Sequence, residues 1–215
     1  MKDRYAIVGP LYDFISTVYS GNSIQHCKVA HLDQLKPGDK VLFAGVGHGR
    51  DALYAAQRGA EVTVVDLSQT MLSNFSGILE KDGVTRNVRK VHSDIMTFNE
   101  GEKYDMVVAN FFLNVFQREM MEKVLAHLIT QGKPGAQIVV GDFAYPSGNI
   151  LARMVKTIYW YLAVVFFWAV AGNAVHNIYN YPELMKKQGL QVKQKKYSRL
   201  LAMNFYWSVL GNKPV

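Results

Sequence analysis

A glycine-rich segment is the part of this sequence best suited to hold a small anionic ligand. The stretch VLFAGVGHGRDALYAA, residues 41–56, places Gly45, Gly47 and Gly49 between an apolar run and an amphipathic segment. Glycine allows a sharp turn and lets bare backbone approach a ligand, and a helix that begins there offers unpaired N–H groups to an anion. We therefore expect a carboxylate or a phosphate to bind at this loop.

An acid follows the loop at a distance that suggests a nucleoside. Asp66 ends the apolar run 61–66, 21 residues after Gly45. In a parallel α/β sheet this position lies beside the glycine loop, where a carboxylate can accept hydrogen bonds from both hydroxyls of a ribose. Dinucleotide-binding proteins carry G-x-G-x-x-G, whose third glycine falls where this chain has Arg50. The spacing therefore argues against a nicotinamide or flavin dinucleotide.

The glycine spacing and the residues after Asp66 resemble a known family. G-x-G-x-G, followed by DLSQTML from Asp66 to Leu72, is similar to the first motifs of class I S-adenosylmethionine-dependent methyltransferases. The likeness is closest to the ubiquinone/menaquinone-type C-methyltransferases, because PLYD (residues 10–13) and YSGN (residues 19–22) are similar to segments that they carry before the first strand. The resemblance extends over most of the chain and implies S-adenosylmethionine as the cofactor.

The resemblance also implies which residues hold this cofactor, from its methionine end to its adenine. The implied cofactor-binding residues are Tyr12, Tyr19, Gly45, Gly47, Gly49, Asp66, Leu67, Met71, Asp94, Ile95 and Asn110. Tyr12 and Tyr19 would close over the methionine end, although packing of an N-terminal helix is an alternative for both. Asp94 would reach the adenine amino group, or would simply cap a helix. Phe43 departs from the family, which usually has an acid there to orient the loop or the cofactor's ammonium group.

The expected reaction makes few demands on catalytic side chains. Methyl transfer is an in-line displacement on an already activated methyl group, so alignment and desolvation can supply most of the catalysis. Oxygen and carbon acceptors must also lose a proton. The candidate bases are His26, Asp142, Tyr145 and His176. No motif surrounds any of them, and a structural role is the simpler interpretation for each.

The elements needed to position these residues alternate along the chain. Apolar runs predict strands at 40–44, 61–66, 88–92, 104–110 and 136–142, with helices at 51–58, 70–81 and 119–129, and KPG at 133–135 precedes the fifth strand. Segments 190–197 and 203–209 predict a closing antiparallel pair. This pattern is typical of a doubly wound, Rossmann-like α/β fold with a seven-stranded, mostly parallel sheet. We expect residues 1–215 to form a single domain.

Two segments lie outside this predicted core. Residues 1–35 are expected to form a helical cover. Residues 147–180 contain the apolar stretch 158–172, whose unbroken apolar run falls short of the ~20 residues that a membrane span needs. This aromatic-rich insertion is expected to cover the acceptor site and favours a hydrophobic acceptor such as a quinone precursor or a lipid. A wholly buried helix and an oligomer interface are the alternatives.

Composition restricts the partners. Lys and Arg outnumber Asp and Glu by 24 to 17, and residues 184–215 hold six lysines, one arginine and no acid. This basic tail suits an anionic partner such as a membrane surface, with a solvated strand face as the alternative. The lone Cys27 suits a reducing compartment, so we expect a cytoplasmic protein with peripheral membrane contact. Nucleic-acid methylation is disfavoured, because Asn110-Phe111-Phe112-Leu113 lacks the paired prolines of base methyltransferases.

No metal is predicted, because the single cysteine stands alone and no two histidines are spaced as metal ligands on one element. A phospholipid N-methyltransferase and a non-catalytic cofactor-binding protein remain alternatives.

Overall fold

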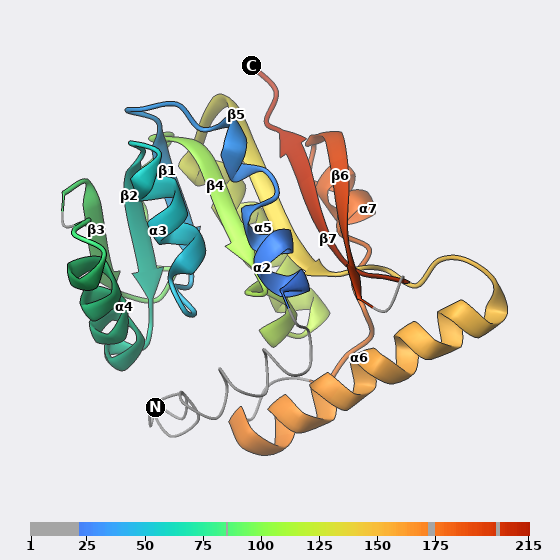
Figure 1. The fold of residues 1–215 in the computed structure, drawn as a ribbon. Coiled ribbons are helices and arrows are strands. Elements are labelled where there is room, and N and C mark those ends of the chain that lie inside the picture. The colour runs from blue at the N-terminus through green and yellow to red at the C-terminus, as the bar shows by residue number, and fades with distance from the viewer. Residues whose placement is uncertain (1–21, 85, 172–174, 201–202) are drawn as a thin grey trace.

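One sheet organises the chain (Figure 1). The structure is a computed structural model that describes residues 22–84, 86–171, 175–200 and 203–215. Within these residues seven strands pair in the order β3-β2-β1-β4-β5-β7-β6. Their bounds are β1 Lys40–Ala44, β2 Glu61–Asp66, β3 Val88–His92, β4 Tyr104–Asn110, β5 Gly132–Phe143, β6 Gln191–Leu200 and β7 Met203–Asn212. Strands β1 to β5 run parallel, and β7 is antiparallel to both β5 and β6. The predicted fold class is confirmed.

The fifth strand differs from its prediction at its start. β5 begins at Gly132, four residues before the predicted position. The register with β4 shifts between the pair Tyr104–Gly132 and the pair Met106–Gln137, so extra residues of β5 are accommodated there as a bulge. Gly135 has a φ of +78° within this bulge. The Pro-Gly pair therefore bends a strand that has already begun.

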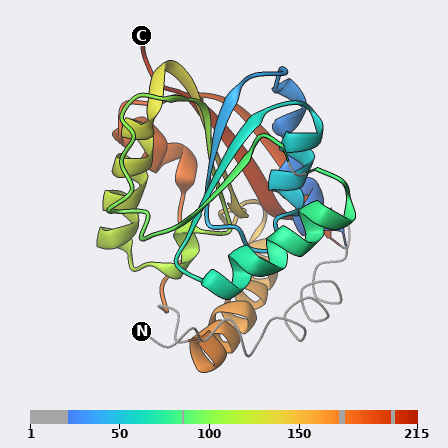
Figure 2. The ribbon, with the colours of Figure 1, turned by 90° about the vertical axis from the view of Figure 1, so that its left-hand side faces the viewer.

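Helices cover both faces of the sheet (Figure 2). α3 (Arg50–Gln57) and α4 (Gln69–Lys81) pack on one face, where leucine, alanine and phenylalanine side chains meet the apolar residues of β1 and β2. α5 (Arg118–Gln131) and α7 (Tyr181–Lys187) pack on the other face, against β4, β5 and β7. A short helix η2 (Leu113–Val115) follows β4. Both faces are thus buried, as a parallel sheet requires.

The described part of the N-terminal segment is helical and lies against the antiparallel strands. α2 (Ser23–Val29) and η1 (Leu32–Gln34) precede β1. Ser23 Oγ donates to the Arg199 carbonyl oxygen at 2.7 Å, and Cys27 Sγ donates to the Trp207 carbonyl oxygen at 3.1 Å. Burial raises the pKa of the Cys27 thiol far above its usual range, which makes this cysteine a packing residue and a poor nucleophile.

The longest described helix follows β5 and crosses the carboxyl end of that strand (Figure 1). α6 (Ile150–Ala171) begins eight residues before the apolar stretch at 158 and includes Arg153 and Lys156. Lys156 is buried, and its Nζ donates to the Ser147 carbonyl oxygen at 3.0 Å. Trp160 and Val164 pack with Phe143, Phe205 and Tyr206.

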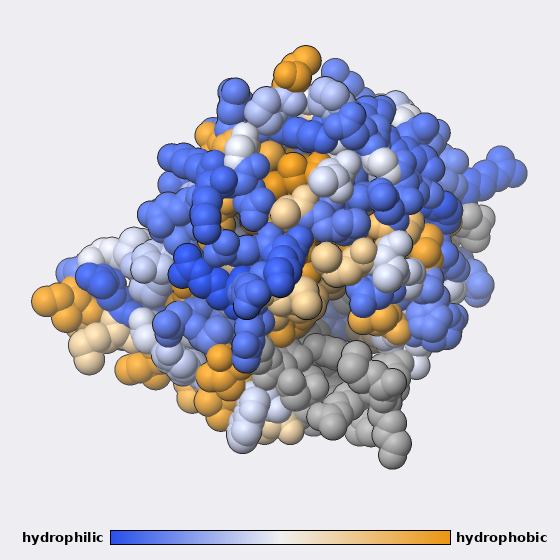
Figure 3. Space-filling view, turned by 180° about the vertical axis from the view of Figure 1, so that it is seen from behind, coloured by the Kyte–Doolittle hydropathy of each residue, from blue (hydrophilic) through white to orange (hydrophobic). Residues whose placement is uncertain are grey.

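The remaining faces of α6 expose apolar side chains to solvent. More than half exposed are Ile150, Leu151, Met154, Ile158, Leu162, Val165 and Trp168. Figure 3 shows hydrophobic side chains at the projecting end of the molecule, where α6 begins, next to hydrophilic surface. None of the helices described here combines the length and apolar character needed to cross a membrane.

Candidate functional site

The glycine loop joins β1 to α3 at the carboxyl end of the sheet. Gly45, Gly47 and Gly49 have φ values of +77°, +49° and +68°. A Cβ on Gly49 would lie 2.2 Å from the Phe75 ring, and one on Gly45 would lie 2.8 Å from the Phe112 ring. Two of the three glycines are therefore required by packing against aromatic rings as well as by their left-handed conformation.

Asp66 holds this loop in place. Its Oδ2 accepts from the Val46 amide at 2.7 Å, and its Oδ1 accepts from the Ser68 amide at 2.8 Å. Ser68 in turn caps α4, because its Oγ accepts from the Met71 amide at 3.2 Å. The spacing of Asp66 suggested a contact with a ribose but gave no sign of these two backbone contacts. The same carboxylate thus connects the glycine loop to the start of α4.

The residues assigned to the adenine end take different positions around the ends of β2 and β3. Leu67 is 57% exposed, whereas Ile95 is 4% exposed and packs in the core. Asp94 is exposed, and its Oδ1 accepts from the Met96 amide at 2.9 Å, so it caps a turn. Asp94 thus caps a turn, and among the described residues no helix begins there; a contact with adenine stays a prediction.

Asn110 ends β4 and lies in a polar cluster that the sequence did not predict. Its Nδ2 donates to the Lys28 carbonyl oxygen at 3.0 Å and to Asp51 Oδ2 at 2.8 Å. Gly141 on β5 leaves room for its Oδ1, since a Cβ there would lie 2.3 Å from that oxygen. Lys28 Nζ would lie 3.5 Å from a Cβ on Gly47, so a cation stands against the loop. No sequence motif marks Lys28 or Asp51 for this role.

The loop and its surroundings fit the cofactor that the resemblance implies. Among the described residues the amides of Gly47 and Arg50 donate no hydrogen bond, and such amides, together with the Lys28 ammonium, suit the methionine carboxylate. The Asp66 carboxylate ends β2 beside the loop and accepts from two amides there, which is the position that the resemblance assigns to the ribose. Phe43 is 2% exposed in the core, so the position of the missing acid contributes no polar contact.

Two of the four candidate bases lie close together at the carboxyl end of β5. Asp142 Oδ1 accepts from Asn114 Nδ2 at 2.8 Å, and Asp142 Oδ2 accepts from the Tyr181 hydroxyl at 2.6 Å. His176 Nε2 lies 2.7 Å from the Asn114 carbonyl oxygen. Asp142 is buried, and this desolvation raises the pKa of its carboxyl to about 6. Asn114 therefore bridges two candidates that are 34 residues apart in the sequence.

The other candidates stand apart from this cluster. Tyr145 is 45% exposed, and His26 is exposed on α2. Tyr145 and His176 line the same groove beneath the first half of α6.

Tyr12 and Tyr19 lie outside the described residues. In the part of the chain that the structure covers, no group of three His, Cys, Asp or Glu side chains could hold a metal ion.

Comparisons with known proteins agree with this architecture. A methyltransferase domain family matches residues 41–135. The chain is 30% identical over 152 residues to the demethylmenaquinone methyltransferase of Clavibacter sepedonicus, which covers 68% of this chain and 59% of that protein. It is 28% identical over 158 residues to the ubiquinone/menaquinone biosynthesis C-methyltransferase UbiE of Ectopseudomonas mendocina, covering 70% and 60%. The chain thus spans less than two thirds of the length of these relatives.

A solved structure shows the same fold over nearly the whole chain. It is the Burkholderia thailandensis 1,6-didemethyltoxoflavin-N1-methyltransferase with bound 1,6-didemethyltoxoflavin and S-adenosylhomocysteine, with a TM-score of 0.71 at 15% identity, covering 99% of this chain and 87% of that one. At this identity the likeness establishes the fold and leaves the acceptor open.

Proposed function

Because the chain carries a class I S-adenosylmethionine-dependent methyltransferase domain, we propose that it transfers the cofactor's methyl group to a small hydrophobic acceptor. Gly45, Gly47 and Gly49 would receive the methionine end, Asp66 the ribose, and Leu67 with Met71 the adenine. The cofactor supplies a methyl group that is already activated. The chain supplies alignment and a site from which water is excluded.

An aromatic cluster at the carboxyl ends of β4 and β5 is the observation that supports a hydrophobic acceptor. Phe111 directly follows Asn110, and its ring lies 5.9 Å from Phe143 and 5.7 Å from Tyr206. Phe143, the last residue of β5, lies 4.8 Å from Trp160 of α6. These rings stand beside the residue expected at the cofactor's reactive end, under the insertion expected to cover the acceptor. Phe111 is partly exposed, whereas Phe143, Tyr206 and Trp160 are buried behind it, so an apolar or aromatic acceptor would meet Phe111 and the buried rings would support it.

The candidate bases support alignment as the main source of catalysis. Asp142 is sealed in the interior, with its oxygens accepting from Asn114, Tyr181 and the Phe143 amide. Both ring nitrogens of His176 lie against carbonyl oxygens, of Asn177 at 2.8 Å and Asn114 at 2.7 Å. Carbonyl oxygens only accept, so neither nitrogen directs a lone pair toward an acceptor. We infer that Asp142 and His176, in the arrangement observed, shape the site and do not remove a proton from the methyl acceptor.

Transfer of labelled methyl groups tests the proposal. The protein is incubated with methyl-labelled cofactor and a prenylated demethylated quinol, and in a parallel arm with phosphatidylethanolamine vesicles. Label in the quinol supports the proposal, whereas label in the phospholipid would replace it by the phospholipid N-methyltransferase alternative. Cofactor binding by calorimetry without transfer to either, or to a panel of small aromatic acceptors, would make the protein a non-catalytic binder.

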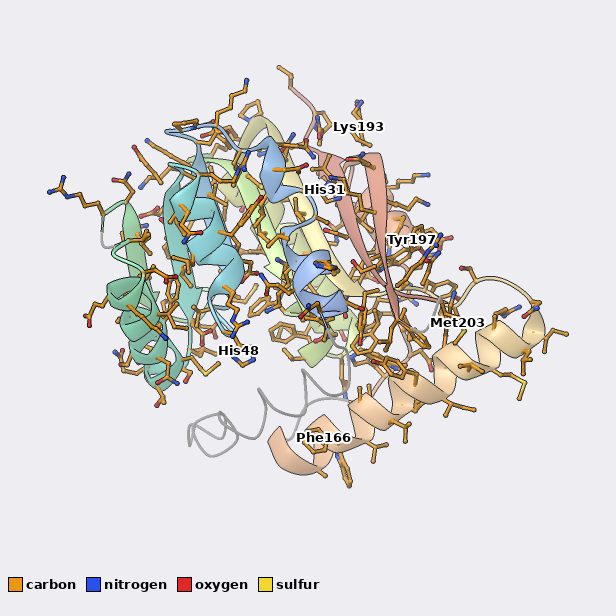
Figure 4. The ribbon with its side chains drawn as sticks, in the orientation of Figure 1. His31, His48, Phe166, Lys193, Tyr197 and Met203 are labelled. Carbon is orange, nitrogen blue, oxygen red and sulfur yellow. The ribbon has the colours of Figure 1, made fainter. Side chains whose placement is uncertain are left out.

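Peripheral membrane contact is part of the proposal and has its own test. The exposed apolar residues of α6 and the basic residues Lys193 and Lys195 of β6 favour it. Lys196 points away from the face expected to carry Lys193 and Lys195, and its Nζ donates to the Ala30 carbonyl oxygen. The register of β6 with β7 shifts between Val192 and Gln194, so the strict alternation of side chains is interrupted at Lys193. Figure 4 places Lys193 toward the end of β6 away from α6, and Tyr197 nearer to α6. Lys193 therefore lies apart from the exposed apolar residues of α6.

Partitioning onto vesicles decides between these features. Binding to anionic vesicles should fall with rising salt, and changing Lys193 and Lys195 together to Gln should weaken it further. Equal partitioning onto neutral and anionic vesicles would assign the contact to α6 alone, and absence of binding to either would contradict membrane contact.

A further inference from the structure

A groove of about 1210 Å³ runs between the first half of α6 and residues 176–187. Its volume lies slightly above the few hundred to ~1,000 Å³ of most ligand pockets, so it is large enough to hold a small molecule. Its lining comes from α6, α7, the segment before α7 and Arg118 of α5. The lining residues include no member of the glycine loop and none of the other residues assigned to the cofactor.

One wall of the groove is an apolar stripe that the protein itself leaves uncovered. Ile150, Met154, Ile158 and Tyr161 line it at helical spacing along α6. These side chains are 77%, 56%, 57% and 38% exposed. Apolar surface of this kind, continuous along a groove, is what an alkyl chain would cover.

The floor of the groove is aromatic, and the polar side-chain atoms of His176, Trp160 and Tyr179 already have partners. The His176 ring stacks on Tyr179 at 4.3 Å and 9°, and Trp160 Nε1 donates to the His176 carbonyl oxygen at 3.1 Å. The Tyr179 hydroxyl donates to the Phe116 carbonyl oxygen at 2.9 Å. The floor therefore offers aromatic surface and makes little demand for a polar ligand group.

Cations are in excess at the solvent side of the groove. Arg118, Arg153 and Lys187 line it, and Glu183 is the acid among its lining residues. Arg118 and Lys187 share one carboxylate, Glu122, at 3.1 and 2.9 Å. Arg153 forms no ion pair with any described residue and is exposed. The charge balance thus favours an anion at the mouth of an otherwise apolar groove.

We propose that this groove binds a single-chain anionic amphiphile, with its alkyl chain along the stripe of α6 and its acid group beside Arg153. A phosphate or sulfate monoester and a fatty carboxylate share this chemistry. The groove shares Trp160 and His176 with the proposed acceptor side, but the amphiphile is a ligand beyond the proposed methyl transfer, and its binding can be measured without that reaction.

Calorimetric titration with monomeric alkyl phosphates tests the proposal. Octyl and decyl phosphate are used below their critical micelle concentrations, with decanol and inorganic phosphate as probes of each half of the ligand. Both phosphates should bind, and decyl phosphate should bind about tenfold more tightly, as two further buried methylenes imply. Decanol should bind at least several-fold more weakly than decyl phosphate.

Variants separate a built site from general attraction. Arg153→Gln should weaken decyl phosphate binding by about fivefold to tenfold, a loss typical of a charge-assisted contact at an exposed site. Arg86→Gln is the matched control, because Arg86 is also exposed and lies before β3 at the opposite edge of the sheet. Met154→Gln should weaken the binding of decyl phosphate more than that of octyl phosphate.

Three results would overturn the proposal: equal binding of decanol and decyl phosphate, equal effects of Arg153→Gln and Arg86→Gln, or no binding of monomers by a protein that binds anionic vesicles. The last would assign this face to a membrane surface. Calorimetry with S-adenosylhomocysteine on the same sample shows separately whether the cofactor site is intact, so failure of this proposal is distinct from failure of the proposed function.

Discussion

Replacing Asp142 by asparagine should make the stability of the variant, relative to that of the wild type, increase as the pH rises. Burial raises the pKa of this carboxyl from 3.8 to about 6 in the folded protein. Between these two values the folded protein keeps a proton that the unfolded chain has released, so wild-type stability falls as the pH rises through this window. Each pH unit contributes about 1.4 kcal/mol, and the whole window therefore amounts to about 3 kcal/mol.

The contacts of Asp142 show which part of this effect depends on pH. An asparagine oxygen can still accept from Asn114 Nδ2 and the Phe143 amide, which donate to Oδ1 at 2.8 and 2.7 Å. The Tyr181 hydroxyl now donates to Oδ2 at 2.6 Å and would meet an amide NH₂ instead, which costs about 1–3 kcal/mol at every pH. The offset is constant, so the pH-dependent part is the quantity to measure.

The pH-dependent part of the stability difference is measured by urea unfolding of both proteins, followed by circular dichroism from about pH 4 to about pH 7. The difference in the free energy of unfolding, variant minus wild type, should increase by about 2.4 kcal/mol across this range, because about 0.6 kcal/mol of the effect is already present at pH 4. Asp105→Asn is the control of opposite sign. Partial burial raises the pKa of Asp105, but hydrogen bonds from Lys133 and the Lys40 amide outweigh it and lower the pKa overall. Its replacement should destabilise the protein at neutral pH and less so as the pH falls. A difference for Asp142→Asn that stays flat with pH would refute the reasoning.

Three further predictions concern the loop and the chemistry. Asp66→Ala should weaken binding of S-adenosylhomocysteine by about 1.5–3 kcal/mol in calorimetry, the range for lost charge-assisted hydrogen bonds. Asp82 is exposed, so Asp82→Ala is the control and should leave this affinity unchanged. If both variants bind S-adenosylhomocysteine with equal affinity, Asp66 is not the ribose acid. Gly49→Ala should lower the free energy of unfolding by at least about 3 kcal/mol, because its Cβ would lie 2.2 Å from Phe75. Gly83→Ala, with a φ of +66° but open space, should cost only about 1–2 kcal/mol, and similar losses would contradict the packing argument. Methyl transfer should survive treatment with chelators. Loss of methyl transfer on chelation, reversed only when a divalent ion is added, would reveal a metal site.

Local patterns predicted the parallel core well because β1, β2 and β4 are short, mainly apolar runs, and β3 is short and has an apolar residue at its start and near its end. β1, β2, β3 and β4 have the predicted bounds. β5 was misjudged at its start, because Pro134 and Gly135 are typical of a loop and only pairing with β4 shows that they lie in a bulge. α6 was underestimated for a related reason. Arg153 and Lys156 interrupt the apolar run without interrupting the helix.

Long-range contacts explain what the sequence did not reveal about the site. The loop spacing pointed to Gly45 and Asp66, since both follow from adjacent strands. The cluster of Lys28, Asp51 and Asn110 joins three segments that only the folded sheet brings together. The contact of His176 with Asn114 spans 62 residues, and no local pattern encodes such a distance. These side chains can be identified only once the order of the strands is known.

The two amide contacts of Asp66 bear on the thermodynamics of ligand capture. With Val46 and Ser68 already held by this carboxylate, the conformational entropy of ordering the loop is lost when the chain folds and not when a nucleoside arrives. A preorganised loop binds with a smaller entropic penalty and without waiting for a slow rearrangement. Association should then be fast and nearly independent of loop motion, and loosening the loop at Asp66 should appear in calorimetry as a less favourable binding entropy.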